Sequence, residues 1–308
     1  MGANVVGRLA PSPSGYLHLG NLLSILLAWL DCRAADGELI FRMEDLDPAR
    51  SKAVYRDAMA ADLRWLGLDW DRGWPEDPAY AQSRRTALYE AAFETLRESN
   101  LVYPCWCSRA QRLAAASAPH PGEAEFDSGC RCARLSEGER AALLAGPRPP
   151  AWKLRSPDET VTVIDGHYGV LYQNPARELG DFILRRADGV FAYQLAVSVD
   201  DRLMGVTRVV RGRDLLSSAP RQHWLIETLG GTPPTYCHGP LLVDRGGKLS
   251  KRMGSLSTQQ LRQTMTPEAL IGRLAFLSGL IDREEPVSAK DLIPDFTWDK
   301  VKKEDIVI

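Results

Sequence analysis

The strongest structural signal in this sequence is the segment Arg8-Leu9-Ala10-Pro11-Ser12-Pro13-Ser14-Gly15-Tyr16-Leu17-His18-Leu19-Gly20-Asn21. It follows the short apolar run Val5-Val6-Gly7 and leads into an apolar-periodic segment at 22–30. This order predicts a strand, a tight turn and the start of a helix. A turn of that kind at the carboxyl end of a parallel strand presents free backbone N–H groups and a helix dipole to an anion. We therefore predict a phosphate-binding crevice in an α/β fold.

The rest of the chain continues the alternation of strand and helix. A strand over 38–43 and helices over 53–66 and 83–99 complete the first half of a doubly wound, Rossmann-like α/β domain. A strand at 205–211, a helix at 218–229 and a strand at 235–243 form the second half, and a helix at 267–280 follows. We predict four parts in chain order. The first half of the catalytic domain spans 1–102, the insert 103–199, the second catalytic half 200–254 and a C-terminal helical segment 255–308.

Bulk composition bounds the function. The chain has 308 residues, a formal net charge of -2, 44% hydrophobic and 25% charged residues, which is typical of a soluble globular protein. Any contact with RNA must therefore come from a local basic patch. No stretch is as long and apolar as a membrane span, and no signal-peptide pattern opens the chain. We expect a cytoplasmic monomer without a membrane anchor.

A second motif lies far downstream, at Lys248-Leu249-Ser250-Lys251-Arg252, directly after Gly246-Gly247. Alone, a histidine after a strand usually caps or packs, and a Lys-x-x-Lys after two glycines is usually a solvated loop. In this order, His18-Leu19-Gly20-Asn21 and the lysine motif resemble the two signatures of class I aminoacyl-tRNA synthetases. The resemblance implies His18, Gly20, Lys248 and Lys251 as catalytic residues, and His18, Gly20, Asn21 and Lys251 as the site of ATP with Mg²⁺.

Within that class the chain resembles the glutamyl-tRNA synthetase catalytic domain over nearly its whole length. The matching motifs are the first turn, Arg42-Met43-Glu44-Asp45-Leu46-Asp47, Tyr193-Gln194-Leu195-Ala196, Val199-Asp200-Asp201 and Val209-Val210-Arg211-Gly212. Guanidinium forks suit the two carboxylates of L-glutamate, and a carboxylate suits its ammonium. The resemblance implies a glutamate pocket of Arg8, Leu9, Ala10, Pro11, Ser12, Glu44, Tyr193 and Arg211. It gives the carboxylates to the two arginines and the ammonium to Glu44.

The expected acceptor follows from where this sequence stops. Bacterial members of the family continue into a helical domain that reads the anticodon, whereas this sequence ends at Ile308. It is therefore similar to the truncated branch of the family, whose members attach glutamate to queuosine in the anticodon loop of tRNA(Asp). Val197 stands where the ordinary pattern has asparagine. The alternatives are a fragment that charges a tRNA 3′ end and a non-catalytic tRNA-binding paralogue.

Four of the six cysteines form two pairs, Cys105-Trp106-Cys107 and Cys130-Arg131-Cys132. Four thiolates suit a closed tetrahedral zinc site. The family pattern is Cys-x-Cys followed by Tyr-x-x-x-Cys, and here Phe126, which cannot bind a metal, stands at the tyrosine position. We predict one structural Zn²⁺ on Cys105, Cys107, Cys130 and Cys132, with His120 as the other choice for the fourth ligand. The alternative is four free cysteines that bind no metal.

Overall fold

Two sheets, of three and four strands, lie side by side as the central sheet layer of the computed structural model, which describes residues 5–107, 130–243 and 256–308. One sheet is parallel, in the order β1-β2-β3, and the other has the order β7-β6-β10-β9. β9 lies beside β1, where Thr207 N donates to Val6 O at 3.0 Å. The strands are β1 (Val6–Leu9), β2 (Glu38–Phe41), β3 (Arg72–Gly73), β6 (Val161–Asp165), β7 (Gly169–Gln173), β9 (Arg208–Gly212) and β10 (Thr235–Gly239).

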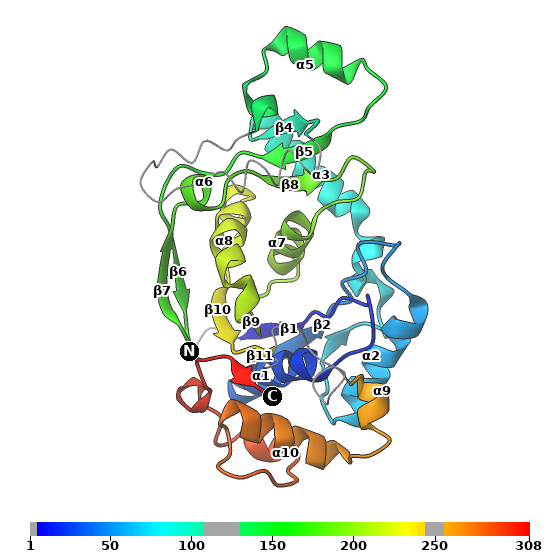
Figure 1. The fold of residues 1–308 in the computed structure, drawn as a ribbon, viewed down its shortest axis with the longest axis vertical. Coiled ribbons are helices and arrows are strands. Elements are labelled where there is room, and N and C mark those ends of the chain that lie inside the picture. The colour runs from blue at the N-terminus through cyan, green and yellow to red at the C-terminus, as the bar shows by residue number, and fades with distance from the viewer. Residues whose placement is uncertain (1–4, 108–129, 244–255) are drawn as a thin grey trace.

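Helices cover both faces of this sheet layer (Figure 1). Helix α1 is buried along most of its length because leucines recur on several of its faces, and it packs against β1, β9 and α10. The other helices near the sheet are α2 (Ala53–Trp65), α3 (Thr86–Glu98), α7 (Tyr193–Leu203), α8 (Ala219–Thr228) and α10 (Pro267–Ser278), with α1 at Leu19–Ala34. The predicted doubly wound α/β fold is confirmed.

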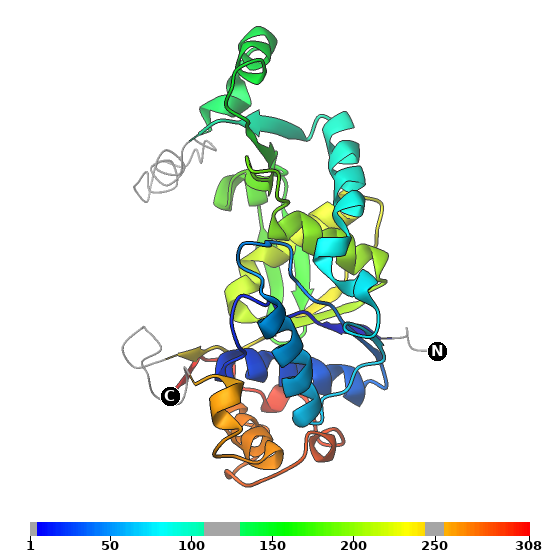
Figure 2. The ribbon, with the colours of Figure 1, turned by 90° about the vertical axis from the view of Figure 1, so that its right-hand side faces the viewer.

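The insert forms a separate small sheet in the order β4-β5-β8, and all its neighbours are antiparallel. It lies at the opposite end of the long axis from α10, beyond α7 and α8 (Figures 1 and 2). Its elements are β4 (Val102–Cys105), α5 (Glu137–Leu144), β5 (Ala151–Leu154), α6 (Pro175–Glu178) and β8 (Phe182–Arg185).

The sequence pattern of Val190 to Tyr193 predicts a strand that ends at Tyr193, but this prediction is wrong, because Tyr193 begins helix α7. Before it, Phe191 makes only an isolated bridge to Arg185, and Ala192 N donates to Leu184 O at 2.7 Å. α7 buries the run from Leu195 to Asp201, whose apolar residues are Leu195, Ala196, Val197 and Val199, and so short an apolar run is also typical of a strand. The predicted limit between residues 199 and 200 falls inside this helix.

The C-terminal segment returns to the centre of the molecule. It contains α10, as expected, and also α9 (Thr258–Leu261), and it ends in β12 (Ile306–Val307), which pairs in parallel with β11 (Leu242–Val243). A two-residue strand has no periodicity of its own, so the sequence did not indicate it. Over the described ranges, no helix has the length and apolar character needed to cross a membrane.

Candidate active site

A cleft of about 700 Å³ opens at the carboxyl ends of β1 and β9. Its walls are the turn after β1, the first residues of α1, the start of α7 and the segment after β9. The predicted residues Arg8, Leu9, Ala10, Pro11, Ser12, His18, Gly20, Asn21, Glu44, Tyr193 and Arg211 all line it. Lys248 and Lys251 lie outside the described residues.

Arg211 enters the cleft from β9 and is held by neutral acceptors. Its Nε donates to His238 Nε2 at 3.0 Å, its Nη1 to Gln222 Oε1 at 2.6 Å and its Nη2 to Leu215 O at 3.1 Å. The guanidinium also lies over the Tyr236 ring, 5.4 Å from its centroid. In the part of the chain that the structure describes, no carboxylate forms an ion pair with Arg211. Its charge is therefore oriented but uncompensated, which favours an incoming anion.

Arg8 supplies a second guanidinium from β1. Its Nη1 donates to Val210 O at 3.0 Å, and its Nε lies 3.7 Å from Asp201 Oδ1 but has no hydrogen-bond partner. Burial lowers the pKa of Arg8, Asp201 opposes this, and the nearby charges of Arg42 and Arg211 add to it. Because these neighbouring cations penalise one another, an anion in the cleft would be stabilised.

Behind these residues, a fully buried Arg42 organises the acidic side of the cleft. Its Nη1 donates to Asp201 Oδ1 at 2.6 Å, and its Nη2 donates to Glu44 Oε1 at 3.0 Å. Burial opposes the charge on Arg42, but Asp201, Glu44 and Asp200 outweigh it and raise the Arg42 pKa well above its usual value. Burial raises the pKa of Glu44, against the pull of Arg42 and Arg8. An ammonium in the cleft would thus find a carboxylate whose ionised form it stabilises.

His18 and Gly20 shape the other side of the cleft, at the start of α1. A Cβ at Gly20 would lie 3.3 Å from the His18 ring, so glycine lets the imidazole lie close to the helix end. Burial lowers the pKa of His18, and its Nδ1 has no hydrogen-bond partner. Asn21 Oδ1 accepts from His18 N at 3.2 Å, so Asn21 also caps this helix. The start of α1 therefore offers a neutral imidazole and a helix N-terminus to a phosphate.

Both flanks of the lysine motif reach this cleft. On one side Leu242 and Val243 line it, and on the other Ser257 bridges to His18. Thr258 N and Oγ1 both donate to Leu17 O, at 2.8 and 3.0 Å. The segment that carries Lys248 and Lys251 therefore leaves and rejoins the described chain beside the cleft.

Four buried side chains hold the site from behind, and sequence reasoning gave none of them a role; Arg42 and Asp201 appeared only inside family motifs, and Gln222 and His238 did not appear. The lining residues Gly212, Asp214 and Leu241 also had no predicted role. The available signal was a polar residue inside an apolar strand or helix, which must find a buried partner. Val197, at the position expected to hold asparagine, is buried in α7 and is absent from the described lining of the cleft.

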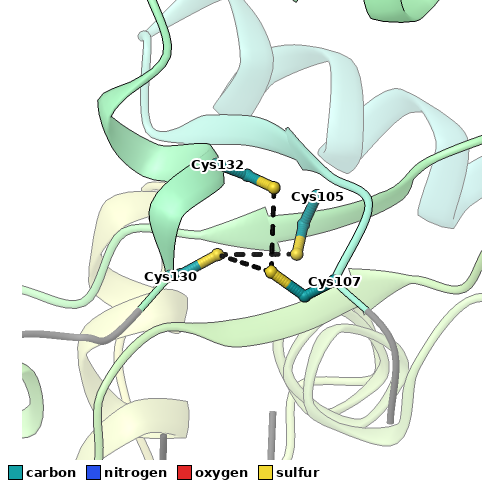
Figure 3. A group of neighbouring side chains, drawn as sticks. All are labelled: Cys105, Cys107, Cys130 and Cys132. Atoms are coloured by element: carbon teal, nitrogen blue, oxygen red, sulfur yellow. Dashed lines mark hydrogen bonds between the residues drawn. The ribbon is translucent and has the colours of Figure 1, made fainter. Parts of the chain in front are cut away.

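The four predicted cysteines form a separate cluster in the insert (Figure 3). All four sulfur atoms lie within 4.8 Å of one another. Cys130 Sγ is 3.5 Å from Cys105 Sγ and 3.8 Å from Cys107 Sγ, and Cys132 Sγ is 3.7 Å from Cys107 Sγ. Tetrahedral zinc with Zn–S bonds of about 2.3 Å requires sulfur–sulfur edges of about 3.8 Å. The cluster has the size and donor set of a Cys₄ zinc site.

The surroundings of the cluster favour a thiolate at one cysteine, Cys130. The hydrogen bond with Cys105, followed by Tyr103 and the Lys153 ammonium, lowers the pKa of Cys130. The hydrogen bond with Cys130, together with burial, raises the pKa of Cys105, and burial raises the pKa of Cys107. Trp106 N donates to Cys132 Sγ at 3.3 Å, which marks that sulfur as an acceptor. Cys132 is thus the fourth sulfur of the cluster, whereas His120 and Phe126 lie outside the described residues. Cys32 and Cys237 are buried elsewhere.

Comparison with known proteins agrees with this geometry. Residues 4–306 match the family model of tRNA synthetases class I (E and Q), catalytic domain. The glutamyl-Q tRNA(Asp) synthetase of Symbiobacterium thermophilum is 47% identical over 98% of this chain and 95% of its own length. The protein of the same name from Nitratidesulfovibrio vulgaris is 48% identical over 93% and 90%. The crystal structure of glutamate-tRNA synthetase from Elizabethkingia anophelis superposes with a TM-score of 0.83 at 28% identity, covering 99% of this chain and 68% of that one.

Proposed function

This chain belongs to the class I tRNA synthetases for glutamate and glutamine, and we propose that it activates L-glutamate with ATP and transfers it to queuosine in the anticodon loop of tRNA(Asp). The reaction class is that of an aminoacyl-tRNA synthetase, a ligase. The two relatives named glutamyl-Q tRNA(Asp) synthetase match this chain over 95% and 90% of their own length. This match supports the queuosine acceptor over the two alternatives, a tRNA 3′ end and mere tRNA binding.

The observation that carries the proposal is the uncompensated charge of Arg211 facing Arg8 and Glu44 across one cleft. Arg8 and Arg211 would bind the two carboxylates of glutamate, and Glu44, oriented by Arg42, would bind the ammonium. Ser12 and Tyr193 would fix its orientation, and Leu9, Ala10 and Pro11 would form the wall. A glutamine side chain would leave one guanidinium without its anion, which supports glutamate as the substrate.

The residues at the start of α1 suit the ATP half of the reaction. An oxygen of the glutamate α-carboxylate attacks the α-phosphorus, the bond to pyrophosphate breaks, and glutamyl-adenylate forms. His18, Gly20, Asn21 and the α1 N-terminus would hold the phosphates, with Mg²⁺ accompanying ATP. Lys248 and Lys251 would neutralise the charge that develops on pyrophosphate. In the second step the queuosine cyclopentenediol hydroxyl attacks the adenylate carbonyl and releases AMP.

The cysteine cluster would hold one structural Zn²⁺ with all four positions filled by protein thiolates. With no open position the metal would take no part in the chemistry, and it would hold Cys130 and Cys132 against Cys105 at the end of β4. The monomeric state and the cytoplasmic location stay predictions.

Two assays test the function. Glutamate-dependent exchange of pyrophosphate into ATP separates an enzyme from a tRNA-binding paralogue, which would show none. Radiolabelled glutamate is then offered to tRNA(Asp) with and without queuosine and to tRNA(Glu). We expect label on queuosine-bearing tRNA(Asp) alone. Label on tRNA(Glu) that disappears when its 3′ adenosine is removed would refute the proposed acceptor.

A further inference from the structure

Three adjacent strands place polar side chains in one row at the carboxyl edge of the sheet. Asp165 ends β6, His238 lies near the end of β10, and Arg211 lies directly opposite His238 on β9. Asp165 Oδ2 is 2.6 Å from His238 Nδ1, and Arg211 Nε donates to His238 Nε2 at 3.0 Å. All three side chains are buried. The row therefore runs from the interior of the sheet into the cleft without a break.

Only one form of the His238 ring satisfies both contacts. The Arg211 guanidinium can only donate, so His238 Nε2 must be the unprotonated nitrogen. The ring proton must then sit on Nδ1, where the Asp165 carboxylate accepts it. Burial lowers the pKa of His238, with Asp165 opposing and the cations Arg211 and Arg8 adding to the shift, so the neutral ring is favoured.

Backbone groups fix which carboxylate oxygen faces the ring. Asp165 Oδ1 accepts from the backbone N–H groups of His167 at 2.9 Å, Tyr168 at 2.8 Å and His238 at 3.4 Å. These donors occupy Oδ1 and leave Oδ2 for the His238 ring. The turn after β6 thus determines the protonated nitrogen of His238 and, through it, the direction of the Arg211 side chain.

We propose that Asp165 and His238 are positioning residues that hold Arg211 at the angle at which it binds a glutamate carboxylate. The proposal rests on the proposed function, since it needs glutamate as the ligand of Arg211. Neither residue touches the substrate, and neither lines the described cleft. Their effect should therefore appear in the KM for glutamate, with kcat and the KM for ATP little changed.

Asp165→Asn is the first test, in the glutamate-dependent exchange assay. The three backbone donors would keep the amide oxygen in the Oδ1 position and turn the amide nitrogen toward His238. That nitrogen only donates, so the ring proton would move to Nε2 and meet the Nε–H of Arg211. We expect the KM for glutamate to rise about tenfold or more, because the guanidinium must turn away. An unchanged KM overturns the proposal.

Two replacements of His238 separate its two contacts. His238→Gln can place an acceptor near the Nε2 position, whereas His238→Asn can reach Asp165 but not Arg211. We expect the His238→Gln variant to have a KM for glutamate near that of the wild type and the His238→Asn variant to have a raised one. The reverse order overturns the proposal. This pair also keeps the test decisive if Asp165→Asn fails to fold.

A double variant and a matched control exclude a general loss of structure. In a His238→Gln background no ring remains to change its proton, so adding Asp165→Asn should leave the KM unchanged. If Asp165→Asn raises the KM for glutamate in this background as much as it does alone, Asp165 does not act on Arg211 through His238, and the proposal is overturned. The His167 side chain belongs to the same buried group, but its two ring nitrogens contact the carbonyls of His238 and Val301, at 2.7 and 3.0 Å, and its ring packs against Tyr168 and Trp298. His167→Gln should lower thermal stability without raising the KM, and a rise equal to that of Asp165→Asn overturns the proposal.

The wild-type protein is assayed first. Absence of glutamate-dependent exchange there contradicts the proposed function, whereas normal exchange with unaltered variants contradicts the positioning role alone.

Discussion

The cleft and the cysteine cluster both join distant segments of the chain, but different forces hold them. The cleft is fixed by buried hydrogen bonds among side chains, such as Arg42 to Asp201 and Arg211 to Gln222. The cluster brings four thiols together, and thiols are weak donors and weak acceptors. The cleft is therefore prepared before any ligand arrives, whereas the cluster has the geometry of a site that a metal completes.

The largest expected effect comes from removing a guanidinium from the cleft. Arg211→Ala or Arg8→Ala would leave a substrate carboxylate buried without its partner, at about 3 to 5 kcal/mol. That corresponds to at least a few hundredfold in apparent affinity for glutamate. The measurement is glutamate-dependent exchange, with the zinc content of each variant as its control, and zinc should be unchanged. Near-normal exchange by either variant would place the pocket elsewhere.

Removal of one cysteine should abolish zinc binding and leave glutamate-dependent exchange intact. Cys132→Ser takes a corner from the tetrahedron, and we expect bound zinc to fall from about one ion per chain to nearly none. Glutamate-dependent exchange should stay close to wild type because the cluster lies beyond α7 and α8 from the cleft (Figure 1). Metal analysis of the purified protein is the measurement. Cys32→Ser, at a buried thiol outside the cluster, is the matched control and should keep its zinc.

A wild-type protein with well under one zinc per chain would contradict the metal assignment itself. If Cys132→Ser lost both its zinc and its glutamate-dependent exchange, the cleft and the cluster would be coupled, contrary to our expectation that they are independent.

Local pattern explains what could be predicted from the sequence. The turn from Arg8 to Gly20 and the alternation of strands and helices follow from short-range periodicity, and carboxyl ends of parallel strands must meet at one edge. For this reason Arg8, Glu44 and Arg211 were expected together, and all three line one cleft. The two Cys-x-Cys pairs supply four thiols, which was enough to predict that Cys132 lies with the other three cysteines. The roles assigned to these residues remain proposals.

What the sequence did not reveal depends on tertiary contacts. Arg42, Gln222 and His238 are polar residues whose importance lies in partners on other elements, and no local rule names those partners. Tyr193 lies in a helix and not in a strand, because a short apolar run such as the one that follows it does not by itself distinguish the two. β12 is too short to show a pattern, and only its pairing with β11 makes it a strand.

A smaller effect should follow from changing the charge balance of Arg211 without removing it. Gln222→Glu would put a carboxylate at the acceptor that now lies 2.6 Å from Nη1. The guanidinium would then be compensated by the protein, so we expect the KM for glutamate to rise about tenfold, equivalent to 1.4 kcal/mol. Steady-state exchange kinetics measure this. Gln222→Met removes the hydrogen bond but adds no charge, and it should raise the KM less. Equal effects from both variants would show that the uncompensated charge is unimportant.

The smallest effect concerns pH and the histidines around the cleft. Burial lowers the pKa of His238 and of His18, whose unfolded value is near 6.5, so the unfolded chain takes up protons that the folded chain excludes. The stabilisation is complete above pH 6.5 and is lost as the pH falls below it. The midpoint of thermal unfolding should therefore decline between pH 7.5 and 5.5, and less steeply in His238→Gln. Acid also releases zinc from thiolates, so the same pair is compared in a Cys132→Ser background, where that contribution is absent. Parallel pH profiles for the two proteins in that background would show that His238 does not carry the effect, and that the cleft owes nothing to its neutral ring.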